Sequence, residues 1–133
     1  MRNVWKFFMT ACLFAAVEGC HVSPGYTVDM ETDSVALCKD VGAEKVKAAI
    51  AKGAANRDWR VIEEDDSRVR LLLDIRGKHE VVVDVFYTAD SFRVKYVSSK
   101  NLDYDPSTKA IRRKYIQWVR NLKHDIRQTA LSM

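Results

Sequence analysis

Cys20 is the residue of this chain best placed for covalent chemistry, because it lies three positions after the end of an apolar run at residues 7–17. Arg2 and Lys6 put positive charge ahead of that run. A basic start and a short apolar stretch that ends in small residues are typical of a secretory signal peptide. A membrane-spanning helix needs ~20 apolar residues, so this stretch is too short for a permanent anchor. We expect residues 1–19 to be removed and the mature chain to begin at Cys20.

The letters VEGC at residues 17–20 resemble the lipobox of bacterial lipoproteins. That motif has an aliphatic residue three places before the cut, a small residue before it and a cysteine after it. Glu18 stands where a small uncharged residue is usual. The resemblance implies that the Cys20 thiol is alkylated with a diacylglycerol and that the new N-terminus is acylated, since stable residence on a membrane needs more than one acyl chain. His21 follows the cysteine in place of aspartate, which in such lipoproteins implies forwarding to the outer membrane.

Two other interpretations of the N-terminus stay open. One is an ordinary secretory signal cut near the same place, because Val17 and Gly19 also satisfy its small-residue rule; the other is a cytosolic N-terminal helix. Cys12 is lost with the signal. If Cys20 is lipidated, Cys38 is left as a lone thiol that is either buried or paired with a second copy; if it is not, Cys20 and Cys38 could form a disulfide.

The mature chain offers little for catalysis. His21, His79 and His124 are scattered and no Cys or His stands at ligand spacing, so we expect no metal site and no cofactor. No glycine-rich phosphate loop or nucleophile elbow is found. Removal of residues 1–19 leaves 20 basic and 17 acidic residues, a net charge near +3. This suits solubility beside an anionic membrane and lacks the clustered basic signature of a nucleic-acid binder.

The elements that would position any site begin after a segment without periodicity. Residues 20–40 contain Pro24-Gly25 and few apolar residues, so we expect a flexible tether there and a single domain over residues 41–133. The first periodic segment is helical, since apolar residues recur at spacings of three and four within GAEKVKAAIAKGAANR, at residues 42–57. Asn56 to Asp58 end this helix.

From residue 59 to residue 98 the apolar period changes to two. Residues typical of turns separate four strand-like segments: WRVIEED, RVRLLLDIR, EVVVDVFY and SFRVKYVS. This pattern predicts a four-stranded antiparallel meander. A register that pairs Arg76 with Glu80 and Tyr87 with Phe92 gives the sheet one apolar and one charged face. The apolar face needs a cover, and the helices at either end of the meander supply it.

A final helix is predicted to start near Pro106 and to bury one stripe of side chains. The stripe consists of Ile111, Tyr115, Trp118, Val119, Leu122 and Ile126. The expected fold class is therefore α+β: a four-stranded antiparallel meander with two helices packed on one face, a two-layer sandwich in the order α-β-β-β-β-α.

Residues 43–126 resemble a group of small, uncharacterised Gram-negative lipoproteins. The shared features are Asp58-Trp59 at the first strand, SKNLDYD at residues 99–105 and the pattern Ile-x-x-x-Tyr-x-x-Trp-Val-x-x-Leu in the last helix. Arg112 and Ile116 stand where such proteins tend to have histidine and asparagine. Membership implies a fold and an envelope location and supplies no activity.

The most polar and aromatic cluster lies between the last strand and the last helix. It consists of Asn101, Asp103, Tyr104 and Asp105. Loops held by a scaffold often carry binding groups, so this is a candidate binding loop. The alternative is that Asn101 and Asp105 hold the turn by hydrogen bonds while Leu102 and Tyr104 close the edge of the core.

Two further sets of charged residues each have two possible interpretations. Arg113, Arg120 and Arg127 recur every seven residues and are either the solvated face of the helix or a membrane-facing strip on anionic headgroups. Asp74 and Asp84 are predicted not to face each other, with Asp84 opposite Leu72 and Lys95, so an ion-paired solvent face is favoured over acid–base catalysis.

The sequence predicts a non-enzymatic, lipid-anchored envelope lipoprotein, a binding or scaffold module whose partners are the membrane, through acylated Cys20, and another envelope protein. The alternative function is a periplasmic inhibitor or immunity-type protein that blocks a partner enzyme through the acidic hairpin at 63–66 or the loop at 98–105. An enzyme, the third candidate, would need a concave polar pocket.

Overall fold

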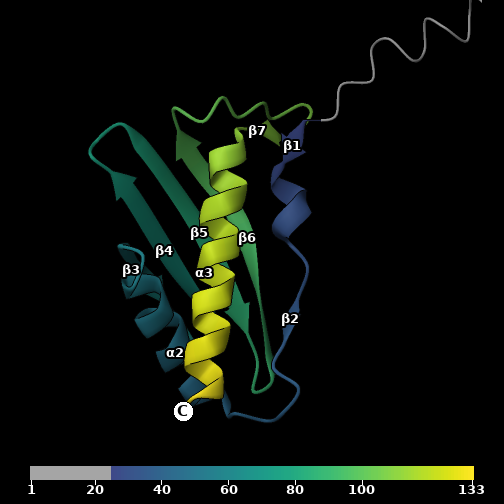
Figure 1. Cartoon of the computed structure of the whole chain (residues 1–133), viewed down its shortest axis with the longest axis vertical. Helices are drawn as coiled ribbons and strands as arrows, with labels where there is room; N and C mark the ends of the chain where they lie inside the picture. Colours follow the sequence, from purple (N-terminus) through teal and green to yellow (C-terminus); the bar gives the residue numbers. More distant parts are fainter. Residues whose placement is uncertain (1–24) are drawn as a thin grey trace, which may run out of the picture.

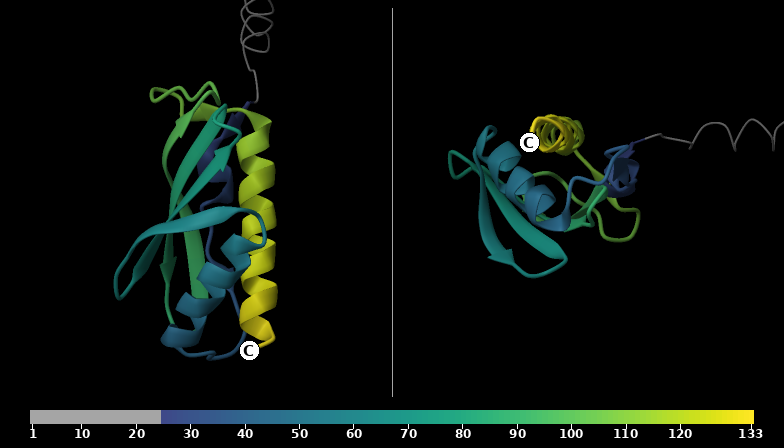
Figure 2. Two further views of the ribbon diagram at one scale, coloured as in Figure 1. Left: turned by 90° about the vertical axis from the view of Figure 1, so that its left-hand side faces the viewer. Right: turned by 90° about the horizontal axis from the view of Figure 1, so that it is seen from below.

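The computed structural model describes residues 25–133, so Cys20 and the whole signal segment lie outside the described residues. Two helices cover one face of an antiparallel sheet (Figures 1 and 2). The helices are α2 (Ala43–Ala55) and α3 (Arg113–Leu131). The α+β class predicted from the sequence is confirmed, and the helix at residues 42–57 lies where its apolar period placed it.

The main sheet has five strands in the order β2-β6-β5-β4-β3. Four of them are the predicted meander: β3 (Trp59–Glu64), β4 (Arg68–Ile75), β5 (His79–Tyr87) and β6 (Ser91–Lys100). The fifth is β2 (Val35–Ala36), which pairs with the outer edge of β6. A second sheet joins β1 (Tyr26–Thr27) to β7 (Ala110–Ile111). The prediction of four strands was therefore wrong in number.

Residues 26–37 form part of the folded domain, whereas the sequence had placed residues 20–40 in a flexible tether. Val28, in the 3-10 helix η1 (Val28–Glu31), and Leu37 are buried in the core. The missed elements are two to four residues long and separated by polar letters, which is too short for a hydrophobic period to show. Their position depends on contacts with β6 and α3, far away in the sequence.

The register between β4 and β5 differs from the prediction by two residues. Asp74 pairs with Glu80 and Ile75 with His79, so the turn is made by residues 76–78. The backbone takes up left-handed φ values of 55° at Arg76 and 71° at Gly77. Because side chains alternate with a period of two, this shift leaves the predicted apolar and charged faces unchanged.

The pairing of Tyr87 with Phe92 is confirmed, and a bulge between Val82 and Val83 shifts the later pairs of β5 and β6. Side chains from the apolar sheet face and from both helices form one core. Its most deeply buried members include Val46, Ile50, Leu71, Val81, Phe92, Tyr115, Val119, Leu122 and Ile126.

Helix α3 begins at Arg113, seven residues later than Pro106 predicted. The Asp105 carboxylate accepts hydrogen bonds from the Ser107 backbone N–H at 2.9 Å and from its hydroxyl at 2.7 Å. These bonds hold residues 105–108 in a turn, and the chain then enters β7. Aspartate and proline favour such turns as well as helix starts, so the sequence signal was ambiguous.

Candidate functional site

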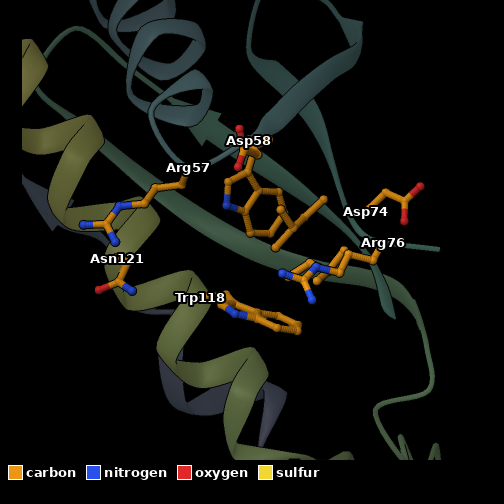
Figure 3. Close-up of a pocket in the computed structure, with 9 residues that line it drawn as sticks. Arg57, Asp58, Asp74, Arg76, Trp118 and Asn121 are labelled. Atoms are coloured by element: carbon orange, nitrogen blue, oxygen red, sulfur yellow. The ribbon is translucent and has the colours of Figure 1, made fainter. Parts of the chain in front are cut away.

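A cavity of about 440 Å³ lies between α3 and the ends of β3 and β4 (Figure 3). Its size falls within the ~300–1,000 Å³ range that is usual for small-molecule sites. Nine residues line it: Arg57, Asp58, Trp59, Leu73, Asp74, Ile75, Arg76, Trp118 and Asn121. We call it the indole cavity, after its two tryptophans.

The cavity exists because α2 is shorter than α3 and leaves part of the sheet beside α3 uncovered. At ~1.5 Å per residue, the 13 residues of α2 span ~20 Å and the 19 residues of α3 span ~28 Å. After α2 the chain bends at Asp58, whose φ is 66°, and enters β3 at Trp59. β4 pairs with β5 as far as Ile75 but with β3 only as far as Leu73. The last residues of β4 therefore lie beyond both β3 and the end of α2, and the surface beside α3 stays open.

Two indoles form the main aromatic surface of the cavity. Trp59 is 3% exposed, so its ring is part of the core as well as of the wall. Trp118, from α3, is half-buried, and its ring centroid lies 6.0 Å from that of His79. Leu73 and Ile75 add aliphatic surface.

The charged side chains around the cavity differ in whether they already form a hydrogen bond or an ion pair. Arg57 Nε donates a 2.8 Å hydrogen bond to the Asp125 carboxylate of α3 and lowers the pKa of that carboxyl. The Asp74 carboxylate accepts a 3.0 Å hydrogen bond from the Gly77 N–H, and Figure 3 shows it directed away from the cavity. Within residues 25–133, Arg76 has no ion-pair partner, and its guanidinium points toward Trp118 (Figure 3).

Each of the four predicted residues of the candidate loop makes a contact that holds the fold together. Asn101, at a left-handed φ of 62°, donates a side-chain hydrogen bond to the Lys78 carbonyl. Asp103 pairs with Arg112 at 2.9 Å, and the ring of Tyr104 lies 4.5 Å from that of Tyr96. Asp105 holds the turn described above. This arrangement matches the structural alternative given for the loop. Of the four predicted residues, Tyr104 lines a cavity of about 280 Å³, which it shares with Tyr96 and Lys109.

The three arginines of the predicted strip have different environments. Arg120 Nε donates a 2.8 Å hydrogen bond to the carboxylate of Glu31, a residue of η1 that is 7% exposed. Arg113 is exposed in the first turn of α3, and Arg127 is half-buried. The strip is therefore not a uniform surface, because its central member binds the N-terminal segment.

Asp84 lies on the outer face of the sheet, opposite Arg70 and not Leu72 as predicted. It accepts hydrogen bonds of 2.7 and 3.0 Å from Arg70 and is 7% exposed. Burial acts to raise the pKa of Asp84, but bonds and charges from Arg70 and Arg68 outweigh it and hold this pKa below its usual range. Asp74 pairs with Glu80, so the two aspartates do not meet and the ion-paired interpretation fits the geometry.

The other sequence predictions concern Cys38, metal sites and membrane-spanning segments. Cys38 is exposed, so the interpretation of a buried thiol was wrong. Among residues 25–133, no three histidine, cysteine or acidic side chains converge as a metal site would require. No helix of that same part of the chain combines the length and apolar character needed to cross a membrane.

Comparison with protein-family models, with curated proteins and with solved structures found no match. The resemblance to small Gram-negative lipoproteins stays a prediction.

The sequence patterns placed Trp59 at the start of the first strand of the meander and Trp118 in the apolar stripe of the last helix, and they did not identify the indole cavity. One signal was present, because the apolar stripe of that helix was expected to cover the sheet that Trp59 begins. What the sequence does not specify is that α2 ends before it covers the two tryptophans.

Proposed function

We propose that this chain is a lipid-anchored lipoprotein of the bacterial cell envelope, with acylated Cys20 in the outer membrane and a non-catalytic binding domain in the periplasm. The signal-like residues 1–19 and the lipobox-like VEGC are the sequence basis of the anchor. The domain acts beside the membrane as a binding or scaffold module.

The observation that carries this proposal is that the chain enters the folded domain soon after Cys20. β1 begins at Tyr26, only six residues later. An extended chain spans at most ~3.6 Å per residue, so the start of β1 lies within ~20 Å of an acylated Cys20. The end of the domain formed by β1, β7 and the loop at 101–109 therefore faces the membrane (upper end in Figure 1).

The charges at this end fit an anionic membrane surface. Lys109, Arg112, Arg113 and Lys114 are all exposed there. Lys109 pairs with Asp29 and Arg112 with Asp103, so the attraction to lipid depends on the other two. Arg113 and Lys114 occupy the first turn of α3, which contains no acidic residue. The helix dipole disfavours cations at a helix N-terminus, so folding stability gives no reason for these positions. Juxtamembrane basic residues contribute ~1 kcal/mol each on an anionic leaflet, which gives them a role in binding lipid.

The indole cavity supports a binding module in preference to an enzyme. Of its nine lining residues, only Asp58 and Asp74 are of a type that could act as a nucleophile or shuttle a proton, and the Asp74 carboxylate is directed away from the cavity (Figure 3). Tryptophan faces, an amide and a guanidinium can hold a ligand without reacting with it.

The inhibitor function has less support. It needs free charges in the acidic hairpin or the loop, yet three of the four hairpin carboxylates are paired. Glu63 and Asp65 pair with Arg68, Glu64 pairs with Lys47, and Asp66 is left without an ion pair among residues 25–133. These pairs would have to break before the hairpin could bind a partner enzyme.

The test is to label bacteria that produce the full chain with radioactive palmitate and to separate inner from outer membranes. We expect label on the protein and the protein in the outer-membrane fraction, and neither for Cys20→Ala. Cys38→Ala is the matched control and keeps both. Soluble, unlabelled natural protein would contradict the proposal.

A further inference from the structure

We propose that the indole cavity is a binding site for a carboxylate carried on a flat, apolar body, with Arg76 as the anion-binding residue and Trp59 and Trp118 as the apolar walls. This inference deepens the proposed binding function by naming the ligand class. It does not depend on the lipid anchor, so the two can fail separately.

The positive charge available to a ligand comes from Arg76. Arg57 also lines the cavity, but its guanidinium already bonds Asp125 at 2.8 Å. Arg76 has no carboxylate within ion-pair distance among residues 25–133, and its nearest acidic neighbour in the chain, Asp74, bonds the Gly77 N–H. A guanidinium offers two parallel N–H groups that match a carboxylate, and such charge-assisted bonds are about twice as strong as neutral ones.

The walls favour a flat apolar group next to that carboxylate. Trp59 and Trp118 line the cavity from β3 and α3, and Figure 3 shows the Arg76 guanidinium directed toward Trp118. Aromatic pairs prefer offset or edge-to-face contacts with ring centroids ~4.5–7 Å apart. A ring placed between the two indoles would therefore make contacts with both while its carboxylate meets Arg76. Asn121, which also lines the cavity, adds an amide for a second polar group.

The backbone holds Arg76 in a position that a side chain seldom occupies. Its φ is 55° and that of Asp58, on the opposite side of the opening, is 66°. Left-handed values at non-glycine residues are uncommon, and glycine would adopt them without cost. Five other non-glycine residues among residues 25–133 share such values, so this backbone does not itself indicate a ligand, but it makes Arg76→Gly a mild substitution.

Two sources offer this ligand chemistry: a small free aromatic acid and the C-terminal aromatic residue of a partner protein. The cavity opens beside β3, an edge strand of the sheet, whose outer edge has no strand partner among residues 25–133. An extended peptide could pair with such an edge and place its last residue in the cavity. Both sources share the same contacts with Arg76 and the indoles.

The test uses the mature chain with Cys20→Ala, which removes only the proposed lipid site, and titrates it with 2-naphthoate by calorimetry. Tryptophan fluorescence gives a second readout, because Trp59 and Trp118 are the only tryptophans after residue 20. We expect binding of 2-naphthoate and at least tenfold weaker binding of the neutral analogue 2-naphthylmethanol. Arg76→Gly should reduce naphthoate affinity at least tenfold and leave that of the alcohol unchanged.

Arg76→Gly suits the left-handed backbone, so loss of folding should not confuse the result. Arg60→Gln is the matched control, because this exposed arginine of β3 does not line the cavity. Trp118→Leu should weaken binding of acid and alcohol alike. No binding of 2-naphthoate to the folded chain, or equal binding by the natural chain and Arg76→Gly, would overturn the proposal.

The source of the carboxylate is tested with a four-residue peptide ending in tryptophan, as the free acid and as the amide. Binding of the acid but not the amide supports a protein C-terminus as the ligand. Binding of 2-naphthoate alone supports a small free acid.

Discussion

Glu31 and Lys123, 92 positions apart in the sequence, form a 2.9 Å ion pair that joins η1 to α3. Their side chains are only 9% and 16% exposed, and Lys123 also donates a 3.2 Å hydrogen bond to the Glu31 carbonyl. This pair, with the bond from Arg120, fixes the N-terminal segment on the domain, so the proposed anchor at Cys20 would be joined to the domain by a short tether.

Replacement of Glu31 by glutamine should therefore destabilise the domain. Glutamine keeps the shape but removes the charge, which leaves Lys123 in a largely buried site without its counter-ion. Hydrogen bonds to charged groups contribute ~1.5–3 kcal/mol, so we expect a loss of about 2 kcal/mol in the free energy of unfolding at pH 7. Chemical denaturation measures it, with Glu44→Gln as the control on an exposed glutamate.

The same pair predicts a pH dependence. Burial acts to raise the pKa of Glu31, but hydrogen bonds and charges from Lys123 and Arg120 outweigh it and hold this pKa below its usual value of 4.5. A lowered folded-state pKa gives stability that is present above the unfolded value and is lost as the pH falls through the folded one. The difference in stability between the natural chain and Glu31→Gln should shrink as the pH is lowered from about 4.5. A difference that is constant down to pH 3 would show that the charge is not what matters.

Gly53 tests how closely the two helices pack. A Cβ added there would lie 2.8 Å from the backbone N and Cα of Ile126, a distance that real Cβ atoms do not adopt. Alanine gains ~1 kcal/mol of helix propensity, whereas overpacking costs ~1–3 kcal/mol or more. Because the clash is with backbone, which cannot rotate away, we expect Gly53→Ala to lower stability by about 1–2 kcal/mol.

The control for Gly53 is the reverse exchange at an exposed position of the same helix. Ala51→Gly should lose only the propensity difference of ~1 kcal/mol. If Gly53→Ala instead stabilises the domain by that amount, the helices are further apart than described.

Much of the fold could be predicted where the pattern is long and local. The meander from Trp59 to Lys100 and the apolar stripe of α3 follow from side-chain periods of 2 and 3.6. The exceptions are β1, η1 and β2, whose pairing depends on distant partners such as Ile111 and Phe92. A period needs several residues to appear, and these elements have two to four.

The site was less predictable than the fold. The loop at 101–105 attracted attention because it is polar and aromatic, but those are also the properties of residues that hold a turn, as Asn101 and Asp105 do. The indole cavity depends on where α2 stops relative to the sheet, and helix ends are set by tertiary contacts as much as by local letters.

Reversal of the charges in the first turn of α3 should have opposite effects on stability and on membrane binding. Arg113→Glu with Lys114→Glu places negative charge where the helix dipole favours it, by ~0.3–1 kcal/mol each. It should also abolish attraction to anionic lipid. We expect the mature Cys20→Ala chain to sediment with phosphatidylglycerol vesicles at low salt, and the double variant to remain in solution while being slightly more stable.

A charge-matched control comes from elsewhere on the domain. Lys52→Glu with Arg60→Glu makes the same change in net charge at exposed positions of α2 and β3. Vesicle binding that falls equally in both double variants would mean that net charge alone is responsible and that the β1–β7 end has no special role.

The most direct test of the central claim is the intact mass of the protein extracted from the membranes of a Gram-negative bacterium that produces it. The account predicts the mass of residues 20–133 plus a diacylglycerol and an acyl chain, and the loss of this modification in Cys20→Ala. A natural chain that carries no added mass, or that keeps residues 1–19, would contradict the lipid anchor and with it the placement of the domain at the membrane.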